Sequence, residues 1–480
     1  MRKLPPLESS NSIVDIHTDL PSLHQVFRYK IHVVTPIFGG GVQAAEVDVN
    51  HPIRISSIRG QLRFWWRATR GAIFDNAYDL RKREVEIFGD TEHPSNVKVW
   101  VEHVGEFNKA SYTVEGGSKD NRSQKQSEPQ ELPYPLYLFQ QKIGTTKDYL
   151  EGSYFTLCIQ LPLLGSINNT DAETMNDLQI DIKSALWAWI NFGGIGARTR
   201  RGGGSLYCED FSPNDDDCSS FTRFFAWFDL AIQKKYRLSF LAKSPTREWP
   251  TLSTDIRVGI NSTSANENTE SWKTVIHSYS SFRKRSNLKS NGKAGRSHWP
   301  EADSIRDLLN SAHPKHAKPL HFSRTNSKKQ VKGFPRAQFG LPIIFQFRPV
   351  KESVEKYIVN NNYLKKISRE PYRTKLTIKG KDRLSSPLLL KSMAFSEEKG
   401  ISLIAFLHQP PITNLILKVE EGSKKNTTYL VRMNMDQMNY VNSPLINKND
   451  SKQLFESAIQ AFLNSEEVKE FCQHPNNRKS

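Results

Sequence analysis

The chain has 480 residues, and its 67 lysines and arginines against 50 aspartates and glutamates give a formal net charge of +17. This charge favours a polyanionic partner, either nucleic acid or an anionic membrane surface. The sequence has no apolar run of about 18 residues, and its first residues lack the apolar core of a signal peptide. We therefore expect a soluble, cytoplasmic protein that is long enough for two domains.

The four cysteines, Cys158, Cys208, Cys218 and Cys472, are far apart in the sequence and form no CxxC pair. Neither a zinc ribbon nor a disulfide framework is therefore predicted, and the cysteines are expected to be ordinary reduced residues. The sequence also lacks a paired-aspartate signature and the Cys/His spacing of metal ligands. We predict no metal site and no cofactor.

The first predicted strand covers residues 27–36, whose alternating apolar and polar side chains suit a half-buried strand. The residues before it, 1–26, are predicted to be an N-terminal tail. The strand runs into Phe38 and a Gly39-Gly40-Gly41 loop. Because glycine has no side chain, this loop can bring the backbone close to a ligand.

Residues 54–70, RISSIRGQLRFWWRATR, carry five arginines and two tryptophans but no carboxylate. If Ser56 or Ser57 caps this arginine helix, helical periodicity separates two faces. The apolar face comprises Ile58, Leu62, Trp65, Thr69 and Ile73. The other face comprises Arg59, Arg63, Arg67 and Arg70. We expect these four arginines to face outward together, with Trp66 between the faces, where it shields the core edge or stacks on a base.

A stripe of charge is often only a solvated helix face, but such faces normally interleave acids with bases. The four arginines have no acid among them, so they would repel one another. This pattern favours a basic face that binds phosphate.

Further strands and a second helix complete the first half. Residues 97–104, 154–164 and 205–209 have the composition of strands, and residues 171–192 show helical periodicity. The polar stretch at 106–130 has little to bury and is predicted to be a surface insertion. The order strand, helix, strand, strand, helix, strand is the ferredoxin-like or split βαβ plan, which RNA-recognition domains also use.

A glycine–arginine loop, residues 193–205 (GGIGARTRRGGGS), joins the second helix to the last of these strands. Its glycines let backbone amides approach phosphates while Arg198, Arg200 and Arg201 pair with them. It is not a dinucleotide-binding fingerprint, because it follows a helix and Thr199 occupies the third glycine's place, and a Walker loop is absent. A merely flexible turn would need the glycines but not three arginines.

A polar run at 213–217 is the predicted boundary between a first domain, 27–212, and a second domain, 213–480. Basic runs without acids follow at 281–300 and 315–336. They are either disordered loops or arms that track phosphates, and the interleaved Trp299, Phe334 and Phe339 favour the second alternative. A second sheet is predicted from the strands 341–347, 386–395, 401–408 and 415–419, and an amphipathic helix, 451–472, closes the chain.

Five segments resemble the motifs of one family, the RAMP proteins that form subunit one of type III-B CRISPR Cmr complexes. They are IRISSIRGQLRFWWRA, LWAWINFGGIGARTRRGGGSL, RSHWPE, FPRAQFGLPIIF and KDRLSSPLLLK, in this order. The resemblance implies an α+β fold with two ferredoxin-like domains and long insertions. The polar insertion and the C-terminal residues lie outside it.

The resemblance also implies a non-catalytic binding and assembly subunit for antiviral defence, in contact with guide RNA, target RNA and other RAMP subunits. Such a subunit holds the 3′ region of the guide and the matching end of the target. Together with Arg70 of the arginine helix, the candidate RNA-binding residues are Arg54, Arg59, Arg63, Trp66, Arg67, Gly194, Gly196, Arg198, Arg200, Arg201, Arg296, Trp299, Arg336 and Arg383. The arginine helix has three candidate partners: guide, target, or carboxylates of a neighbouring subunit.

Two other functions compete with this hypothesis. Related RAMP folds process guide RNA, so a metal-independent endoribonuclease is the enzymatic alternative, with candidate histidines His32, His51, His298, His313 and His316. None of these histidines lies in the arginine helix or in the glycine–arginine loop. The other alternative is a free-standing RNA-binding protein.

Overall fold

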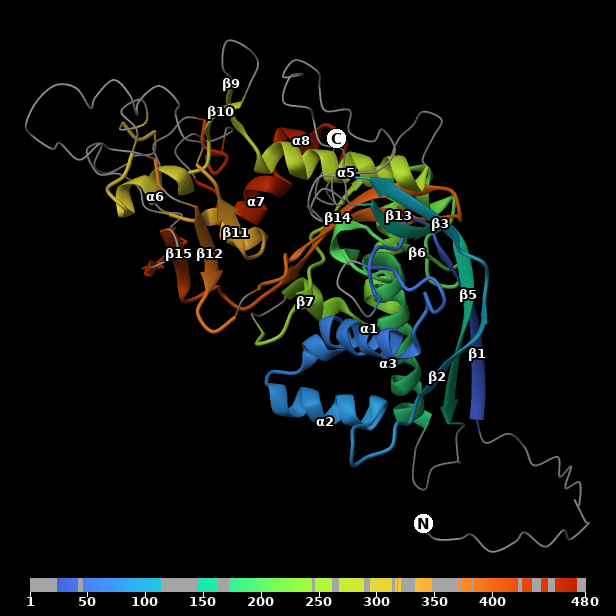
Figure 1. Ribbon diagram of the computed structural model, residues 1–480. Helices are drawn as coiled ribbons and strands as arrows, with labels where there is room; N and C mark the ends of the chain where they lie inside the picture. The colour runs from blue at the N-terminus through green and yellow to red at the C-terminus, as the bar shows by residue number, and fades with distance from the viewer. Residues whose placement is uncertain are drawn as a thin grey trace, which may run out of the picture.

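The computed structural model has an α+β architecture with several antiparallel sheets (Figure 1). It describes residues 24–41, 46–113, 146–162, 172–243, 247–260, 267–288, 294–312, 316, 318–320, 333–347, 370–371, 373–381, 383–421, 425–433, 442–447 and 454–472. Within these residues, no helix is both long and apolar enough to cross a membrane.

The first half is built on a four-stranded antiparallel sheet with the order β2-β5-β1-β6. Its strands are β1 (His24–Val33), β2 (Lys98–Val104), β5 (Ser153–Pro162) and β6 (Leu206–Tyr207). Alternate residues of β1 are buried on one face because each strand residue points opposite to the next. The predicted strands therefore exist, with ends that differ by a few residues.

Two long helices cover the buried face of this sheet: α1 (Ile55–Ala68) and α3 (Ala172–Phe192) (Figure 1). A shorter helix, α2 (Ala77–Phe88), lies on the outer side of α1. After β6 the chain continues into α4 (Phe221–Leu230). The sequence did not predict α2, whose residues carry charge on most of their exposed positions.

The predicted polar insertion begins with a strand rather than with irregular structure. Strand β3 (Asn108–Thr113) pairs with β4 (Thr146–Glu151) in a two-stranded antiparallel ribbon. Residues 108–113 of the predicted surface insertion therefore form a strand, because backbone pairing can hold a polar segment that buries few side chains. The rest of the predicted insertion lies outside the described residues.

The second half contributes a sheet of β7 (Thr251–Leu252), β8 (Arg257–Gly259), β13 (Leu388–Ala394) and β14 (Gly400–His408). Strand β14 pairs with the other three, always antiparallel. The helix α5 (Asn268–Arg283) packs on β13 and β14. Leucines of β13 and β14 belong to the same buried cluster as the residues of α3, so one core joins the two halves.

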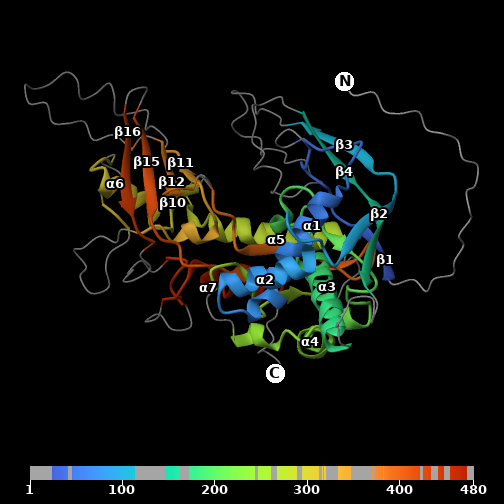
Figure 2. The same ribbon diagram turned by 90° about the horizontal axis from the view of Figure 1, so that it is seen from below.

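A separate lobe carries another antiparallel sheet, with the order β11-β12-β15-β16 (Figures 1 and 2). Its elements are α6 (Glu301–Leu308), β11 (Ile343–Phe345), β12 (Thr374–Ile378), β15 (Leu415–Glu421) and β16 (Lys425–Val431), next to the hairpin β9 (Ser286–Leu288) and β10 (Ala294–Ser297). The lobe has its own buried cluster. The predicted single second sheet is therefore wrong, since its four strands are divided between two sheets.

The chain ends in two short helices, α7 (Ala458–Leu463) and α8 (Glu466–Lys469). The predicted single amphipathic helix over 451–472 is wrong. Ser465 lies between the two helices with extended backbone, which interrupts the helical hydrogen bonding.

Candidate nucleic-acid interface

Helix α1 is the predicted arginine helix, but its first turn differs from the prediction. Arg54 is the N-cap, with extended backbone, and no side chain caps the helix. The side chains of Ser56 and Ser57 lie inside the first turn and are exposed. The predicted serine cap is therefore wrong, and Arg54 stands at the N-terminal end of α1.

The apolar face of α1 is largely as predicted. Ile58, Leu62 and Trp65 are buried against the sheet and α3, whereas Ile73 lies beyond the helix and is 51% exposed. Trp66 is completely buried. The prediction that Trp66 lies at the seam between two faces is wrong, and in this fold its ring has no surface on which a base could stack.

Helix α2 supplies the carboxylate that α1 lacks. Oε1 of Glu84, whose side chain is 5% exposed, accepts hydrogen bonds from Nε of Arg63 at 2.7 Å and from Nη1 of Arg67 at 2.5 Å. Arg59 and Arg63 also donate to backbone oxygens where α2 ends, at the negative end of its dipole. The expectation that these arginines face outward together is wrong, because they hold α2 against α1.

Arg70 is also engaged within the fold. It lies after the end of α1 and donates from Nε to Oδ1 of Asp181 on α3 at 3.2 Å. Arg83 of α2 donates to the other oxygen of the same carboxylate at 2.8 Å. Asp181 is 5% exposed, so this buried carboxylate ties three helical segments together.

The glycine–arginine loop leaves α3 and leads into β6 through a short 3-10 helix, Thr199–Arg201. Arg198 precedes this turn with φ +65°, and Gly196 and Gly204 also have positive φ. A Cβ atom on Gly204 would lie 2.0 Å from the backbone oxygen of Ile195. The glycines are thus needed by the turn itself, since a side chain would clash or strain the backbone.

The loop meets the Phe38–Gly41 loop that the sequence also marked. The amide of Ala197 donates to the oxygen of Phe38 at 2.6 Å. A Cβ atom on Gly40 would lie 3.5 Å from Cα of Gly196 and 3.9 Å from Nη2 of Arg54. The start of α1 and the glycine–arginine loop therefore border one surface. Gly194, by contrast, is buried against the backbone of the same loop.

Guanidinium groups are crowded at this loop. Burial and, after it, the charge of Arg201 lower the pKa of Arg200 to about 10. Partial burial and the charges of Arg201 and Arg383 lower the pKa of Arg198. Burial is the larger cause of both shifts, and repulsion between neighbouring guanidinium groups adds to it. A bound polyanion would relieve this repulsion.

Two of these arginines are held in place by groups from distant parts of the chain. Arg200 donates to the backbone oxygen of Ser386 at 2.5 Å and lies 5.6 Å from the ring centroid of Phe64. Arg201 lies 4.2 Å from the ring centroid of Tyr279 and donates to its hydroxyl at 3.0 Å. The sequence did not single out Phe64, Ser386 or Tyr279, although Phe64 lies inside the arginine helix.

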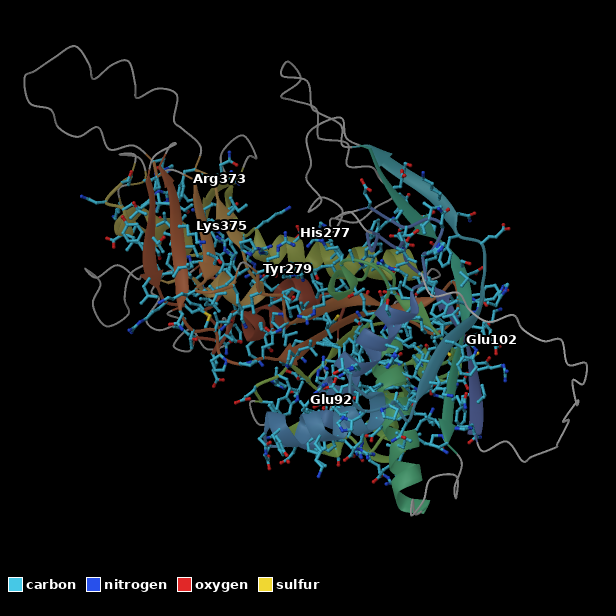
Figure 3. All side chains as sticks on the ribbon, turned by 60° about the horizontal axis from the view of Figure 1, so that its bottom comes forward. Glu92, Glu102, His277, Tyr279, Arg373 and Lys375 are labelled. Atoms are coloured by element: carbon cyan, nitrogen blue, oxygen red, sulfur yellow. The ribbon has the colours of Figure 1, made fainter. Side chains whose placement is uncertain are left out.

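The same crowded guanidinium groups affect the pKa of the Tyr279 hydroxyl. Figure 3 shows Tyr279 on α5, between the first sheet and the lobe. Burial is the largest effect on its pKa and raises it, but Arg201, Arg283 and Arg336 together outweigh burial and lower the pKa. Arg201 of the loop, Arg283 of α5 and Arg336 of the lobe therefore all act on this one hydroxyl.

The other predicted residues of the second half hold the lobe together. Arg296 donates to Asp303 at 2.6 Å, and Arg336 pairs with Glu301 at 3.1 Å; both carboxylates are buried on α6. Trp299 is 1% exposed and packs under Arg336. The interpretation of Trp299 as a stacking surface is therefore wrong.

The structure thus brings together only part of the predicted set. We call this part the glycine–arginine site. It comprises Arg54, Gly196, Arg198, Arg200, Arg201 and Arg383 of that set, together with Gly40 of the Phe38–Gly41 loop.

The candidate histidines make separate contacts. His32 lies 3.3 Å from Glu397, and burial, the largest effect, lowers its pKa. His298 contacts an asparagine at 2.8 Å, and His316 contacts a glutamate at 2.6 Å. His313 lies outside the described residues.

The four cysteines are free and buried. Burial is the largest effect on each thiol and raises its pKa, to about 11 for Cys158 and about 12 for Cys208. In the part of the chain that the structure describes, no group of three His, Cys, Asp or Glu side chains could hold a metal ion.

Comparisons with known proteins give one family. The model of the RAMP superfamily matches residues 30–207. The CRISPR system Cmr subunit Cmr1-2 of Pyrococcus furiosus is 29% identical over 189 residues, which are 37% of this chain and 92% of that protein. Subunit Cmr1-1 of the same organism is 27% identical over 159 residues, which are 32% of this chain and 40% of that protein.

Two solved structures are also similar. The crystal structure of apo Cmr1 from Pyrococcus furiosus has a TM-score of 0.41 and 17% identity, over 84% of this chain and 94% of that one. The cryo-EM structure of the type III-B Cmr-beta complex bound to cognate target RNA contains a chain with a TM-score of 0.39 and 13% identity, over 79% of this chain and 94% of that one.

Proposed function

We propose that this chain, whose residues 30–207 match the RAMP superfamily model and which is similar to the Cmr1 subunits, is a non-catalytic RNA-binding and assembly subunit of a type III-B CRISPR effector complex. Its RNA-binding surface is the glycine–arginine site. In the complex it holds the 3′ region of the guide RNA and the matching end of the target, beside other RAMP subunits.

The observation that carries this proposal is the crowding of guanidinium groups at the glycine–arginine loop. The pKa values of Arg198 and Arg200 are lowered by burial and by neighbouring cations. In α1, by contrast, Arg63 and Arg67 share the buried carboxylate of Glu84. A phosphate backbone is the ligand that stabilises crowded guanidinium groups, because each can donate two parallel hydrogen bonds to it.

Recognition at this site is of backbone rather than of sequence. The exposed Gly196 lets a phosphate approach the main chain of the loop, and the arginines supply the charge. Guide–target pairing reads the sequence. Neutralising several phosphates makes binding weaken with salt, with a log–log slope of about 0.7 per phosphate on a single strand.

The arrangement of strands supports a ferredoxin-like reading of both halves. In the first sheet, the order β2-β5-β1-β6 with α1 and α3 on one face is that of a split βαβ unit. In the second half, α5 follows β8, and β14 lies between β13 and β8, which matches the first three strands of the same plan among the residues that the structure describes. The lobe is then formed by two segments of the chain: a long insertion between α5 and β13, and the strands β15 and β16 that follow β14.

The test is to measure RNA affinity over a range of salt concentrations for Arg200→Glu and for the double variant Arg198→Glu/Arg383→Glu. Both should bind guide-length RNA more weakly and with a shallower salt slope, while the thermal midpoint of the double variant stays close to wild type. The matched control is Arg223→Glu, since Arg223 lies on α4 and is 56% exposed. Wild-type affinity and slope in both site variants would exclude the glycine–arginine site.

The enzymatic alternative is tested by incubating the purified full chain with labelled guide and target RNA, with and without Mg²⁺. We expect intact RNA in all cases. Discrete cleavage that is lost in His32→Ala or His316→Ala would replace the binding proposal by a metal-independent endoribonuclease.

A further inference from the structure

Four rings form a continuous band across the face of the first sheet that points away from α1 and α3. The ring centroids of His103 and Tyr154 lie 5.4 Å apart, those of Tyr154 and His32 5.5 Å, and those of His32 and Tyr207 6.1 Å. Each ring comes from a different strand, in the spatial order β2, β5, β1, β6. We call these four residues the aromatic band.

The pairing register fixes the direction of the band. His32 of β1 is opposite Tyr154 on one side and Tyr207 on the other. The neighbours of His32 along β1, Ile31 and Val33, are buried on the helix-covered face. Because side chains alternate along a strand, the rings must point to the opposite face. His103 is exposed, and the other three residues are partly exposed.

The charges around the band are mixed: Glu397 lies 3.3 Å from His32, and Glu209, Glu397 and Asp215 lie near Tyr207, so the cationic side of the band is at Tyr154. Nζ of Lys30 lies 4.3 Å from the ring centroid of Tyr154. On the same face, Glu102 is paired with Arg28 at 3.0 Å (Figure 3 labels Glu102). Burial lowers the pKa of His32, against the opposing effect of Glu397.

We propose that the aromatic band is a second RNA-contacting surface, which takes the bases of about two or three unpaired nucleotides by stacking. Rings on the two central strands of a four-stranded antiparallel sheet are where RNA-recognition domains place their stacking residues. Here these positions hold His32 and Tyr154. Lys30 covers the Tyr154 ring without RNA, and it moves to an adjacent phosphate when a base takes its place.

Two residues of the aromatic band are close in sequence to the loops of the glycine–arginine site. Tyr207 follows Gly204, the last glycine of the glycine–arginine loop, by three residues. His32 stands near the end of β1, which leads directly into the Phe38–Gly41 loop. A strand whose phosphates lie in the loops can therefore place its next unpaired bases on the sheet. The inference rests on the proposed function but adds base contacts to it.

A purely structural role is the competing explanation, since cross-strand aromatic pairs also stabilise sheets. Tyr154→Leu separates the two, because it removes the ring but keeps an apolar side chain. For the full chain, we expect it to weaken binding of a fluorescein-labelled oligouridylate about fivefold or more, as for loss of one stacked base. Tyr154→Phe should bind like wild type, and the salt slope should not change, because no charge is lost.

The matched control is Tyr78→Leu, which removes a tyrosine that is 79% exposed on α2. It should leave RNA binding unchanged. A second measurement does not depend on variant folding: photo-crosslinking of wild type to 4-thiouridine RNA should map to Tyr154, His103 or Tyr207. A duplex of the same length should compete poorly for the crosslinks on the sheet, because its bases are not available for stacking.

Wild-type affinity of a folded Tyr154→Leu, or crosslinks that avoid the sheet, would overturn the aromatic band. If Arg200→Glu still weakened binding in that case, the glycine–arginine site would stand without the band. If both variants bound like wild type, both proposals would fail.

Discussion

Nε1 of Trp272 donates a hydrogen bond to the backbone oxygen of Arg201 at 2.5 Å. This contact joins α5 of the second half to the glycine–arginine loop of the first. A Cβ atom on Gly202 would lie 2.4 Å from the same indole nitrogen, so the loop packs directly on the ring. The packing of Trp272 of α5 against Arg201 and Gly202 therefore helps to fix the conformation of the loop.

Trp272→Phe is expected to destabilise the protein and weaken RNA binding together, because the oxygen of Arg201 loses its buried donor. The loss of this hydrogen bond should cost about 1–3 kcal/mol. The matched control is Trp249→Phe, since Trp249 is 8% exposed and its indole nitrogen has no hydrogen-bond partner among the described residues. Urea unfolding and fluorescence anisotropy measure the two effects. Equal destabilisation in both variants would contradict this role of Trp272.

Glu84→Gln should destabilise the fold by about 3 kcal/mol, because Arg63 and Arg67 would be left without their shared carboxylate. The neighbouring variant Glu86→Gln is the control, as Glu86 is 47% exposed and pairs only at the surface. Thermal unfolding at low ionic strength compares them. If the loss were confined to RNA affinity, with stability unchanged, the arginines of α1 would be ligands rather than packing groups.

Two glycine substitutions should change the stability of the fold in opposite directions. Gly204→Ala should destabilise by about 2 kcal/mol or more, because φ is +61° and the new Cβ would meet the oxygen of Ile195. Gly60→Ala should stabilise by about 0.5–1 kcal/mol, because Gly60 is an exposed position inside α1 with no atom within 4 Å of a new Cβ. The denaturant midpoints of the two variants measure whether each substitution lowers or raises stability. A Gly204→Ala variant more stable than wild type would contradict the loop geometry.

Stability should rise with pH through one buried amine. Lys391 on β13 donates to backbone oxygens of Ile190 and Gly193 at 3.2 and 2.8 Å, where α3 ends. Burial lowers its pKa from 10.5 to about 7. Between these values the unfolded chain binds more protons than the folded one, so the free energy of unfolding increases with pH.

The variant Lys391→Met isolates this effect. The difference in free energy of unfolding between wild type and Lys391→Met should shift in favour of wild type as pH rises from about 7 to 10, by at most about 1.4 kcal/mol per pH unit. Equilibrium denaturation at several pH values measures it. A difference independent of pH would mean that Lys391 keeps its ordinary pKa in the folded state.

The sequence could predict those structural features that depend on residues close together along the chain. Helical periodicity located α1 and its buried face, and the glycines of residues 193–205 predicted a tight turn with clustered arginines. It could not predict Glu84 beneath Arg63, because the contact depends on how α2 packs against α1. The same applies to the β-strands of the second half: composition identified 341–347 and 401–408 as strands but contains no information on which sheet each one joins.

The common core limits how this protein can be divided. Leu389, Met393 and Leu403 of the second half are buried in one cluster with Leu186 and Trp189 of the first. A fragment that ended near residue 212 would expose these aromatic and aliphatic side chains to water and would be prone to aggregate. The two halves should therefore unfold in a single cooperative transition. A substitution that destabilises one half would then also lower the stability of the other half.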